Sequence, residues 1–292
     1  MNTDVLCEVL FPVGQEAQST PFLEEAFTLM RSFEQRYSRF IAGNELFVFN
    51  QSEEKVLSPE FFDILTQAKH YYEFTDGLFD PSILPALEKE GYHGATTTIN
   101  SEEKGVFSEL HLDPQTRTAT KPRNLRIDLG GIGKGYIVDR VASFLAQHFE
   151  HFLVDAGGDI ATKGSNMCEG YPYWAIEVEH PLNKEESAAL LLLSDKAVAT
   201  SGRNRRHWLK EGQEKHHIID PRTQKSATSA FLSVTAVAEN TLSADILAKT
   251  LFIAGPEGLL LAEQWRVPAL FIENSGKVTR NQYIEKYVWK AL

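Results

Sequence analysis

The segment from Leu125 to Tyr136 constrains the fold of this chain more than any other part of the sequence. Its first residues are apolar at every second position, as in a half-buried strand. Four glycines and a lysine follow, after which apolar residues recur at helical spacing as far as Leu145. The order of strand, glycine-rich turn and helix exposes bare backbone and unpaired N–H groups at a helix start, an arrangement typical of phosphate and nucleotide sites.

The glycine-rich turn matches neither of the two common phosphate-binding motifs. A P-loop requires Ser or Thr after its Gly-Lys pair, where this chain has Gly135, and a Rossmann fingerprint requires glycine where it has Tyr136. Asp128 and Lys134 flank the turn with opposite charges. We therefore interpret the turn as a candidate pyrophosphate site; a glycine-rich connection without a ligand is the alternative.

Composition excludes several classes of protein. The chain has 292 residues, of which 42% are hydrophobic, so it is long enough for one large domain or two small ones. A formal net charge of −11 argues against binding to nucleic acid, which requires basic surface stripes. Cys7 and Cys168 lie far apart and predict neither a disulfide framework nor a zinc site. No signal peptide is visible and no apolar run could span a bilayer, so we expect a cytoplasmic protein without membrane insertion.

The predicted strands come in groups between helices, which favours an α+β fold with largely antiparallel mixed sheets and flanking helices. We expect strands over residues 5–11, 125–129, 152–156, 174–178, 190–193, 197–200, 217–220, 231–238, 268–273 and 277–280. We expect helices over residues 21–37 with Thr20 as the N-cap, from Pro59 to about residue 75, after the glycine-rich turn, and over residues 242–254. Residues 1–292 are predicted to form a single domain, with a possible division into two lobes near residue 160.

Several polar clusters lie where predicted strands or helices end. They are the runs Thr75–Pro81, Asp155–Asp159, Thr200–Gly202, His217–Thr223 and Ala244–Thr250. On a strand, His217 and Ile219 would share one face. Each run taken alone is explained as well by a turn, a strand exit or a surface ion pair.

The order of these clusters is more specific than any one of them. In succession the chain reads T-D-G-L-F-D-P, D-L-G-G-I-G-K-G, a G-G-D strand exit, T-S-G, H-I-I-D-P-R-T and A-D-I-L. This succession, from about Phe33 to Gly255, resembles the ApbE family of FAD:protein FMN transferases. The resemblance implies that the chain binds FAD and moves its FMN half onto a Ser or Thr hydroxyl of an acceptor protein, with release of AMP.

The resemblance also implies roles for individual residues. Phe40 occupies the aromatic position that stacks on the cofactor, and Leu78, Phe79 and Asp80 match the segment that contacts the flavin nucleotide. Further FAD contacts are implied for Asp128, Lys134 and Ile219. His217 matches the residue that assists the acceptor hydroxyl, with Asp220 as its orienter or as an alternative base. Ligands of a magnesium ion are implied at Asp245 and at the main-chain carbonyl of Gly131.

One departure from the family pattern concerns the metal. The family places Thr four residues after the metal-binding aspartate, where this chain has Lys249, and Thr250 points roughly 100° away around a helix. A protonated lysine offers no lone pair to a metal. Either the ion is held by fewer protein ligands, or the charge of Lys249 replaces it beside the pyrophosphate. Two other functions stay open: an FAD pyrophosphatase, in which water replaces the acceptor hydroxyl, and a non-catalytic FAD-binding protein.

A second departure follows the T-S-G run, where Arg203, Arg205 and Arg206 add positive charge. These side chains are expected to contact a phosphate or an acidic surface of the acceptor protein; a solvated loop is the alternative.

Overall fold

The computed structural model describes residues 3–14, 16–95, 105–166, 170, 172–203 and 207–289. The chain divides into two compact units. Unit 1 comprises Met1–Ser32, Lys134–Asn204 and Ser229–Leu292, and unit 2 comprises Phe33–Gly133 and Arg205–Thr228. The predicted α+β class is confirmed, because helices accompany sheets in which every described strand pair is antiparallel.

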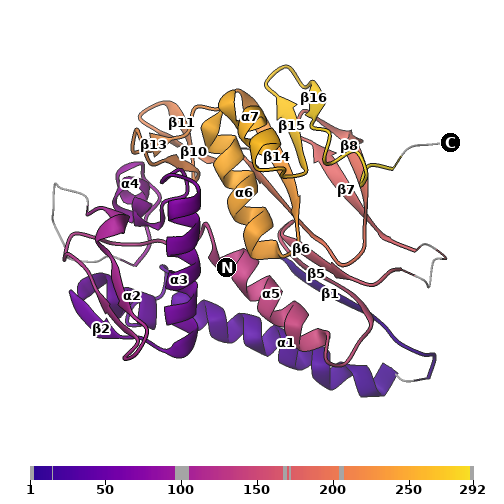
Figure 1. The fold of residues 1–292 in the computed structure, drawn as a ribbon, viewed down its shortest axis with the longest axis horizontal. Helices are drawn as coiled ribbons and strands as arrows, with labels where there is room; N and C mark the ends of the chain where they lie inside the picture. The colour runs from indigo at the N-terminus through magenta and orange to yellow at the C-terminus, as the bar shows by residue number, and fades with distance from the viewer. Residues whose placement is uncertain are drawn as a thin grey trace. The chain divides into compact units, whose positions relative to one another are not determined.

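Unit 1 is built on a seven-stranded sheet with the order β1-β5-β6-β9-β14-β15-β16 (Figure 1). The strands are β1 (Val5–Leu10), β5 (His151–Ala156), β6 (Ile160–Lys163), β9 (Ala197–Gly202), β14 (Phe231–Ala238), β15 (Ala269–Glu273) and β16 (Val278–Arg280). A separate hairpin is formed by β7 (Trp174–His180) and β8 (Asn183–Leu193). The helices are α5 (Gly133–Leu145), α6 (Thr241–Ala254), α7 (Glu257–Gln264) and the first part of α1 (Glu16–Tyr37).

The two faces of this sheet are covered by different elements. Helix α6 packs against β9 and β14 on one face, where Ala197 and Ala199 meet Ala244. The β7–β8 hairpin covers the other face, where Val198 joins a core cluster that includes Trp174. Successive residues of β9 therefore point to opposite layers, as the two-residue period of a strand requires. Figure 1 shows α6 and the β7–β8 hairpin on opposite sides of β14.

Unit 2 combines short helices with two- and three-stranded sheets. Its helices are α2 (Glu45–Gln51), α3 (Pro59–Phe74) and α4 (Leu84–Lys89), with short 3₁₀ helices at Pro81–Ile83 and Phe107–Glu109. Its strands are β2 (Glu54–Val56), β3 (His111–Asp113), β4 (Thr118–Thr120), β10 (His207–Lys210), β11 (Gln213–His216), β12 (Ile219–Asp220) and β13 (Lys225–Ser226). The predicted start of α3 is confirmed, because Ser58 is the N-cap and Pro59 follows it.

The prediction of a strand over residues 125–129 is wrong. This segment is buried but belongs to no ladder. The side chain of Asn50 replaces a neighbouring strand, since its amide bonds both the N–H of Ile127, at 2.8 Å, and the carbonyl oxygen of Ile127, at 3.0 Å. The N–H of Asp128 donates to the carbonyl oxygen of Pro81 at 2.8 Å. Side-chain and loop partners therefore satisfy the backbone polar groups here.

Two further predictions of element bounds are wrong. Helix α1 begins at Glu16, so Thr20 is not its N-cap, and Pro21 lies inside the helix. Only Ile219 and Asp220 of the run 217–220 form a strand, and His217 lies in a bend between β11 and β12. The predicted shared strand face of His217 and Ile219 is therefore absent. The predicted strands β1, β5, β7, β9 and β14 and the β15–β16 hairpin are confirmed within a few residues.

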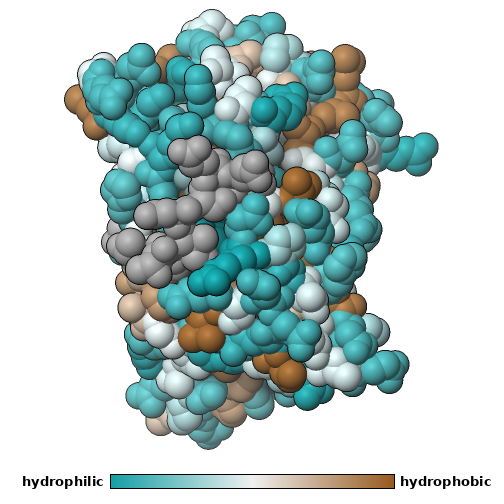
Figure 2. All heavy atoms as spheres, turned by 90° about the vertical axis from the view of Figure 1, so that its left-hand side faces the viewer, coloured by the Kyte–Doolittle hydropathy of each residue, from teal (hydrophilic) through white to brown (hydrophobic). Residues whose placement is uncertain are grey.

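Figure 2 shows one face of the molecule, on which hydrophilic side chains predominate and hydrophobic ones form small patches. Among the described residues, none of the helices has both the length and the apolar character needed to cross a bilayer.

Candidate functional site

The Asp128 carboxylate, at the start of the glycine-rich turn, makes two contacts within unit 2. Its Oδ2 accepts a hydrogen bond from the N–H of Gly130 at 2.8 Å, and its Oδ1 lies 3.2 Å from Nε of Arg39. Both Asp128 and Arg39 are buried. The backbone of the turn thus bonds the side chain of Asp128, and the buried guanidinium of Arg39 compensates its charge.

Arg39 also organises a group of aromatic rings in unit 2. Its guanidinium carbon lies 4.7 Å from the ring centre of Phe40 and 4.3 Å from that of Tyr92. Its Nη2 donates to the carbonyl oxygen of Tyr92 at 2.9 Å. Tyr92 stacks on Trp208 with 5.1 Å between ring centres. Phe40 remains 51% exposed, so a ring at the edge of this group is available to a planar ligand.

The segment Leu78–Asp80 lies beside the glycine-rich turn through the bond between Asp128 and Pro81. The hydroxyl of Thr75 accepts a hydrogen bond from the N–H of Phe79 at 3.0 Å, and Phe79 is buried. Oδ1 of Asp80 accepts bonds from the N–H of Ser82 at 2.7 Å and from its hydroxyl at 2.6 Å. The polar atoms of the T-D-G-L-F-D-P run therefore build a turn that places this segment next to Asp128.

The residues predicted to assist the acceptor hydroxyl lie in and beside β12. Asp220 is buried and forms a bidentate pair with Arg222, with Oδ1 at 3.0 Å from Nε and Oδ2 at 2.9 Å from Nη2. His217 is half-buried in the bend before β12. Ile219 is buried in a cluster with Ala86 and Leu87. A guanidinium therefore fixes the position of the Asp220 side chain, and His217 is the more accessible of the two predicted groups.

Unit 1 contains a compact group of four charged side chains, which we call the tetrad: Lys134, Asp159, Asp245 and Lys249. The ammonium of Lys134, in the first turn of α5, pairs with Asp159, which follows β5. In α6, Nζ of Lys249 lies 2.9 Å from Oδ1 of Asp245, one helical turn away. Both carboxylates are buried, with side chains 2% exposed for Asp159 and 4% for Asp245.

The two ion pairs of the tetrad act on one another. Burial raises the pKa of the Asp159 carboxyl, and the nearby charge of Asp245 raises it further. The ammoniums of Lys134 and Lys249 lower the pKa of the same carboxyl. Asp159 therefore feels the charge of α6 as well as that of its own partner in α5.

The tetrad does not fit a divalent metal ion. Asp245, the predicted side-chain ligand, is already paired with an ammonium, and Asp159 is paired with another. The hydroxyl of Thr250 is buried and donates to the carbonyl oxygen of Ile246 at 2.8 Å, so it faces the helix backbone. No group of three His, Cys, Asp or Glu side chains in the described part of the chain could hold a metal ion. A divalent ion would add positive charge beside two ammoniums.

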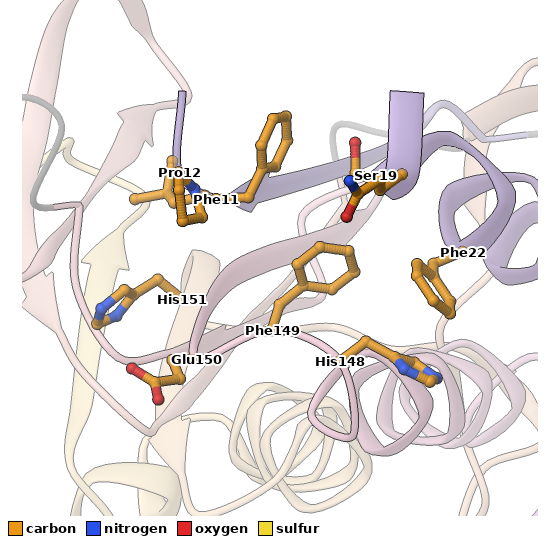
Figure 3. A pocket seen from close by; sticks show the side chains of 10 residues that line it. Phe11, Pro12, Ser19, Phe22, His148, Phe149, Glu150 and His151 are labelled. Carbon is orange, nitrogen blue, oxygen red and sulfur yellow. The ribbon is translucent and has the colours of Figure 1, made fainter. Parts of the chain in front are cut away.

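A cavity of about 670 Å³ lies elsewhere in unit 1 (Figure 3). It is lined by Phe11, Phe22, His148, Phe149 and other residues near the start of β5 and beyond the end of α5. Lys134 and Asp159 lie at the opposite ends of α5 and β5, so this cavity is distinct from the tetrad. None of its lining residues belongs to the motifs described above.

Two residues of these groups were missed by the sequence reasoning. Arg39 directly precedes the predicted aromatic Phe40, but a single arginine in a polar run carries no signal of its own. Asp159 was noticed only as the end of a G-G-D exit, because nothing local indicates that its partner is Lys134, 25 residues away. The predicted basic contacts at Arg205 and Arg206 lie outside the described residues.

Comparison with known proteins identifies relatives over most of the chain. The model of the ApbE family matches residues 1–271. The chain is 30% identical over 270 residues to the FAD:protein FMN transferase of Vibrio cholerae, covering 88% of this chain and 80% of that protein. It is 28% identical to the protein of the same name from Haemophilus influenzae, covering 88% of this chain and 80% of that protein.

Solved structures agree with these sequence relatives. The flavin transferase ApbE from Vibrio cholerae superimposes with a TM-score of 0.83 at 27% identity, covering 98% of this chain and 96% of that chain. The ApbE protein from Thermotoga maritima has a TM-score of 0.84 at 24% identity, covering 98% of this chain and 100% of that chain, and supports the fold alone.

Proposed function

The chain belongs to the ApbE family, and on this basis we propose that it is an FAD:protein FMN transferase. The observation that carries the proposal is the 30% identity to a transferase of that name over 88% of the chain. The family match runs through both units, so the proposal treats residues 1–292 as a single transferase domain.

The proposed reaction joins a Ser or Thr hydroxyl of an acceptor protein to the phosphorus of the FMN half of FAD. The hydroxyl oxygen forms a new P–O bond, and the P–O bond to the AMP half breaks, with AMP leaving with the bonding electron pair. The hydroxyl proton passes to a base. Such a step depends on positioning and on stabilising the charge of the diphosphate.

Within unit 2, the proposal gives each residue a role that its surroundings support. Phe40 stacks on the flavin, because its ring is exposed and is held by Arg39. Asp128 contacts the nucleotide from its buried pair with Arg39. His217 accepts the proton of the acceptor hydroxyl.

The other predicted residues support these roles. Leu78, Phe79 and Asp80 shape the segment next to Asp128, and the bidentate pair of Asp220 with Arg222 favours a positioning role over that of a base. Ile219 packs against Ala86 and Leu87 and so stabilises the same unit.

Within unit 1, Lys134 is proposed to contact a phosphate of FAD from the first turn of α5, where the helix dipole also favours an anion. A magnesium ion on Asp245 and the carbonyl of Gly131 stays a prediction that the pairing of Asp245 with Lys249 does not favour. No step of the proposed reaction depends on this ion.

The natural setting is also part of the proposal. The partners are FAD and an acceptor protein that carries the modified Ser or Thr, and the net charge of −11 argues against nucleic acid as a partner. The scarcity of cysteine supports a cytoplasmic location.

The test is to incubate the purified chain with FAD and a flavin-accepting protein domain. We expect a fluorescent acceptor band that survives denaturation, an acceptor mass increase equal to an FMN phosphoester, and release of AMP. The variant His217→Asn should lower the rate at least about a hundredfold and leave FAD binding intact, as loss of a general base does. His207→Asn, an exposed histidine of β10 in the same unit, is the matched control and should not change the rate.

Two results would replace the proposal. Free FMN and AMP formed from FAD without any acceptor would identify an FAD pyrophosphatase. Binding of FAD without turnover, with every acceptor and metal tested, would identify an FAD-binding protein.

A further inference from the structure

The acids and the lysines of the tetrad differ in their exposure to solvent. The two carboxylates are the buried members, with side chains 2% exposed in Asp159 and 4% in Asp245. The two ammoniums are more exposed, at 22% for Lys134 and 14% for Lys249. The part of the tetrad that solvent reaches is therefore positive, and the negative charge lies behind it.

The carboxylates also fix where the ammoniums lie. A lysine side chain is a flexible four-carbon stem, so its ammonium rarely occupies a single position on a protein surface. Here Asp245 holds Nζ of Lys249 at 2.9 Å within one face of α6, and Asp159 holds Lys134. Both pairs belong to unit 1, and in each of them a buried acid holds a more exposed ammonium.

We propose that the ammonium of Lys249 takes the place of a divalent cation in this chain, so that FAD binds through two fixed ammoniums and needs no metal. This inference rests on the proposed use of FAD. An ammonium has three donors and can bond a carboxylate and a phosphate oxygen at the same time. A divalent ion would instead need Asp245 as a ligand and would meet the positive charge of Lys249 beside it.

The test measures FAD affinity by quenching of flavin fluorescence, with EDTA and with excess Mg²⁺. We expect the unmodified chain to bind FAD equally well in both conditions. Lys249→Thr should bind FAD about tenfold more weakly in EDTA and should recover with Mg²⁺, because the hydroxyl and the released Asp245 can then hold the ion. Lys249→Arg keeps the charge and should bind without metal, which separates loss of charge from loss of fold.

A second readout does not use FAD. Electron paramagnetic resonance of Mn²⁺ should detect a bound ion in Lys249→Thr and none in the unmodified chain. Lys277→Thr is the matched control, because Lys277 also pairs with an acid four residues away, Glu273, but is 71% exposed. It should change neither FAD affinity nor Mn²⁺ binding.

The outcomes separate this inference from the proposed function. An unmodified chain that binds Mn²⁺, or that gains FAD affinity about tenfold with Mg²⁺, overturns the inference and leaves the transferase proposal standing. Binding of FAD without metal and without flavin transfer supports the inference and overturns the transferase proposal. A chain that binds no FAD in either condition overturns both.

Discussion

Arg39 joins two residues that the resemblance assigned to FAD without indicating any link between them. Its guanidinium pairs with Asp128 and lies over the ring of Phe40, while its Nη2 bonds the backbone of Tyr92. A planar guanidinium can donate in its plane and stack on both faces, and lysine cannot. We infer that Arg39 positions Phe40 and Asp128 together.

Arg39→Lys should therefore weaken FAD binding about tenfold, although the charge is kept. Arg123→Lys, an exposed arginine of the same unit, should have no effect. Flavin fluorescence titration measures both affinities, and absorption spectra of the bound flavin report whether a ring still stacks on it. Equal affinity for the unmodified chain and Arg39→Lys would show that Phe40 does not depend on Arg39.

Lys121 is a buried cation outside the candidate site. Its Nζ has no hydrogen-bond partner among the described residues and lies 5.2 Å from the ring centre of Phe49. Burial lowers the pKa of Lys121, Glu53 opposes this change and the nearby Arg126 adds to it, and the net result is a pKa of about 8. The folded protein therefore holds this proton less tightly than the unfolded chain does.

The sign of the pH effect follows from that difference. Between pH 8 and 10.5 the unfolded chain binds more protons at Lys121 than the folded protein, so the contribution of Lys121 to the free energy of unfolding rises with pH in this window. Lys121→Met should stabilise the protein by about 1 kcal/mol at pH 7 and should gain progressively less above pH 8. Urea unfolding of both proteins at several pH values measures the difference, and a constant difference would contradict the pKa of Lys121.

At the scale of elements, an acid of α5 caps the start of α6 and so links the two helices. The carboxylate of Asp139, in α5, accepts hydrogen bonds from the N–H groups of Thr241 at 2.7 Å and Leu242 at 2.8 Å. These are two of the N–H groups that a helix leaves unpaired at its start. The side chain of Asn240 accepts from the N–H of Ser243, so α6 has two capping side chains.

Asp139→Ala should lower the free energy of unfolding by about 2 kcal/mol, because it leaves two N–H groups at a buried helix start without partners. Glu257→Ala removes an exposed acid from the first turn of α7 and should cost less than about 0.5 kcal/mol. Chemical denaturation measures both. A loss of similar size in the two variants would show that the cap contributes little.

Gly135 permits the close approach of the same two helices. A Cβ atom at this position would lie 2.6 Å from Cα of Leu242 and 2.8 Å from the carbonyl oxygen of Thr241. Backbone atoms cannot move aside as side chains do. One glycine of the predicted phosphate turn is therefore required for helix packing, whatever the turn binds.

Gly135→Ala should destabilise the protein by about 3 kcal/mol, because it forces α5 and α6 apart. Gly133→Ala is the control, since its Cβ would meet only side chains, the ring of Phe33 at 3.4 Å and Cβ of Leu129 at 3.8 Å, and it should cost about 1 kcal/mol or less. Thermal unfolding measures both variants. Equal stability of the two variants would contradict the close packing at Leu242.

At the scale of the whole molecule, the candidate residues belong to two compact units. The aromatic group, the glycine-rich turn as far as Gly133, His217 and Asp220 lie in unit 2, and the tetrad lies in unit 1. The boundary between Gly133 and Lys134 falls inside the D-L-G-G-I-G-K-G motif. One short motif thus contributes Asp128 to one unit and Lys134 to the other.

Local patterns in the sequence were sufficient for the elements whose burial repeats with a regular period. The strand β14 and the helix α6 are examples, because their hydrophobic patterns and flanking turns are local. The succession of motifs was also sufficient to identify the family, since it needs only residue types in order. The segment 125–129 had an equally regular pattern but forms no strand, because its backbone bonds the side-chain amide of Asn50 instead of a neighbouring strand. A hydrophobic pattern does not indicate which group will bond the backbone.

What only the tertiary structure decided is which charges meet. Lys249 and Asp245 are one helical turn apart, so their pairing follows from the sequence alone. The pairing of Lys134 with Asp159 and the bonds of Arg39 to Asp128 and Tyr92 join residues from separate elements. Periodicity specifies which face of an element is buried, whereas electrostatic contacts depend on distances between elements that only the folded chain brings together.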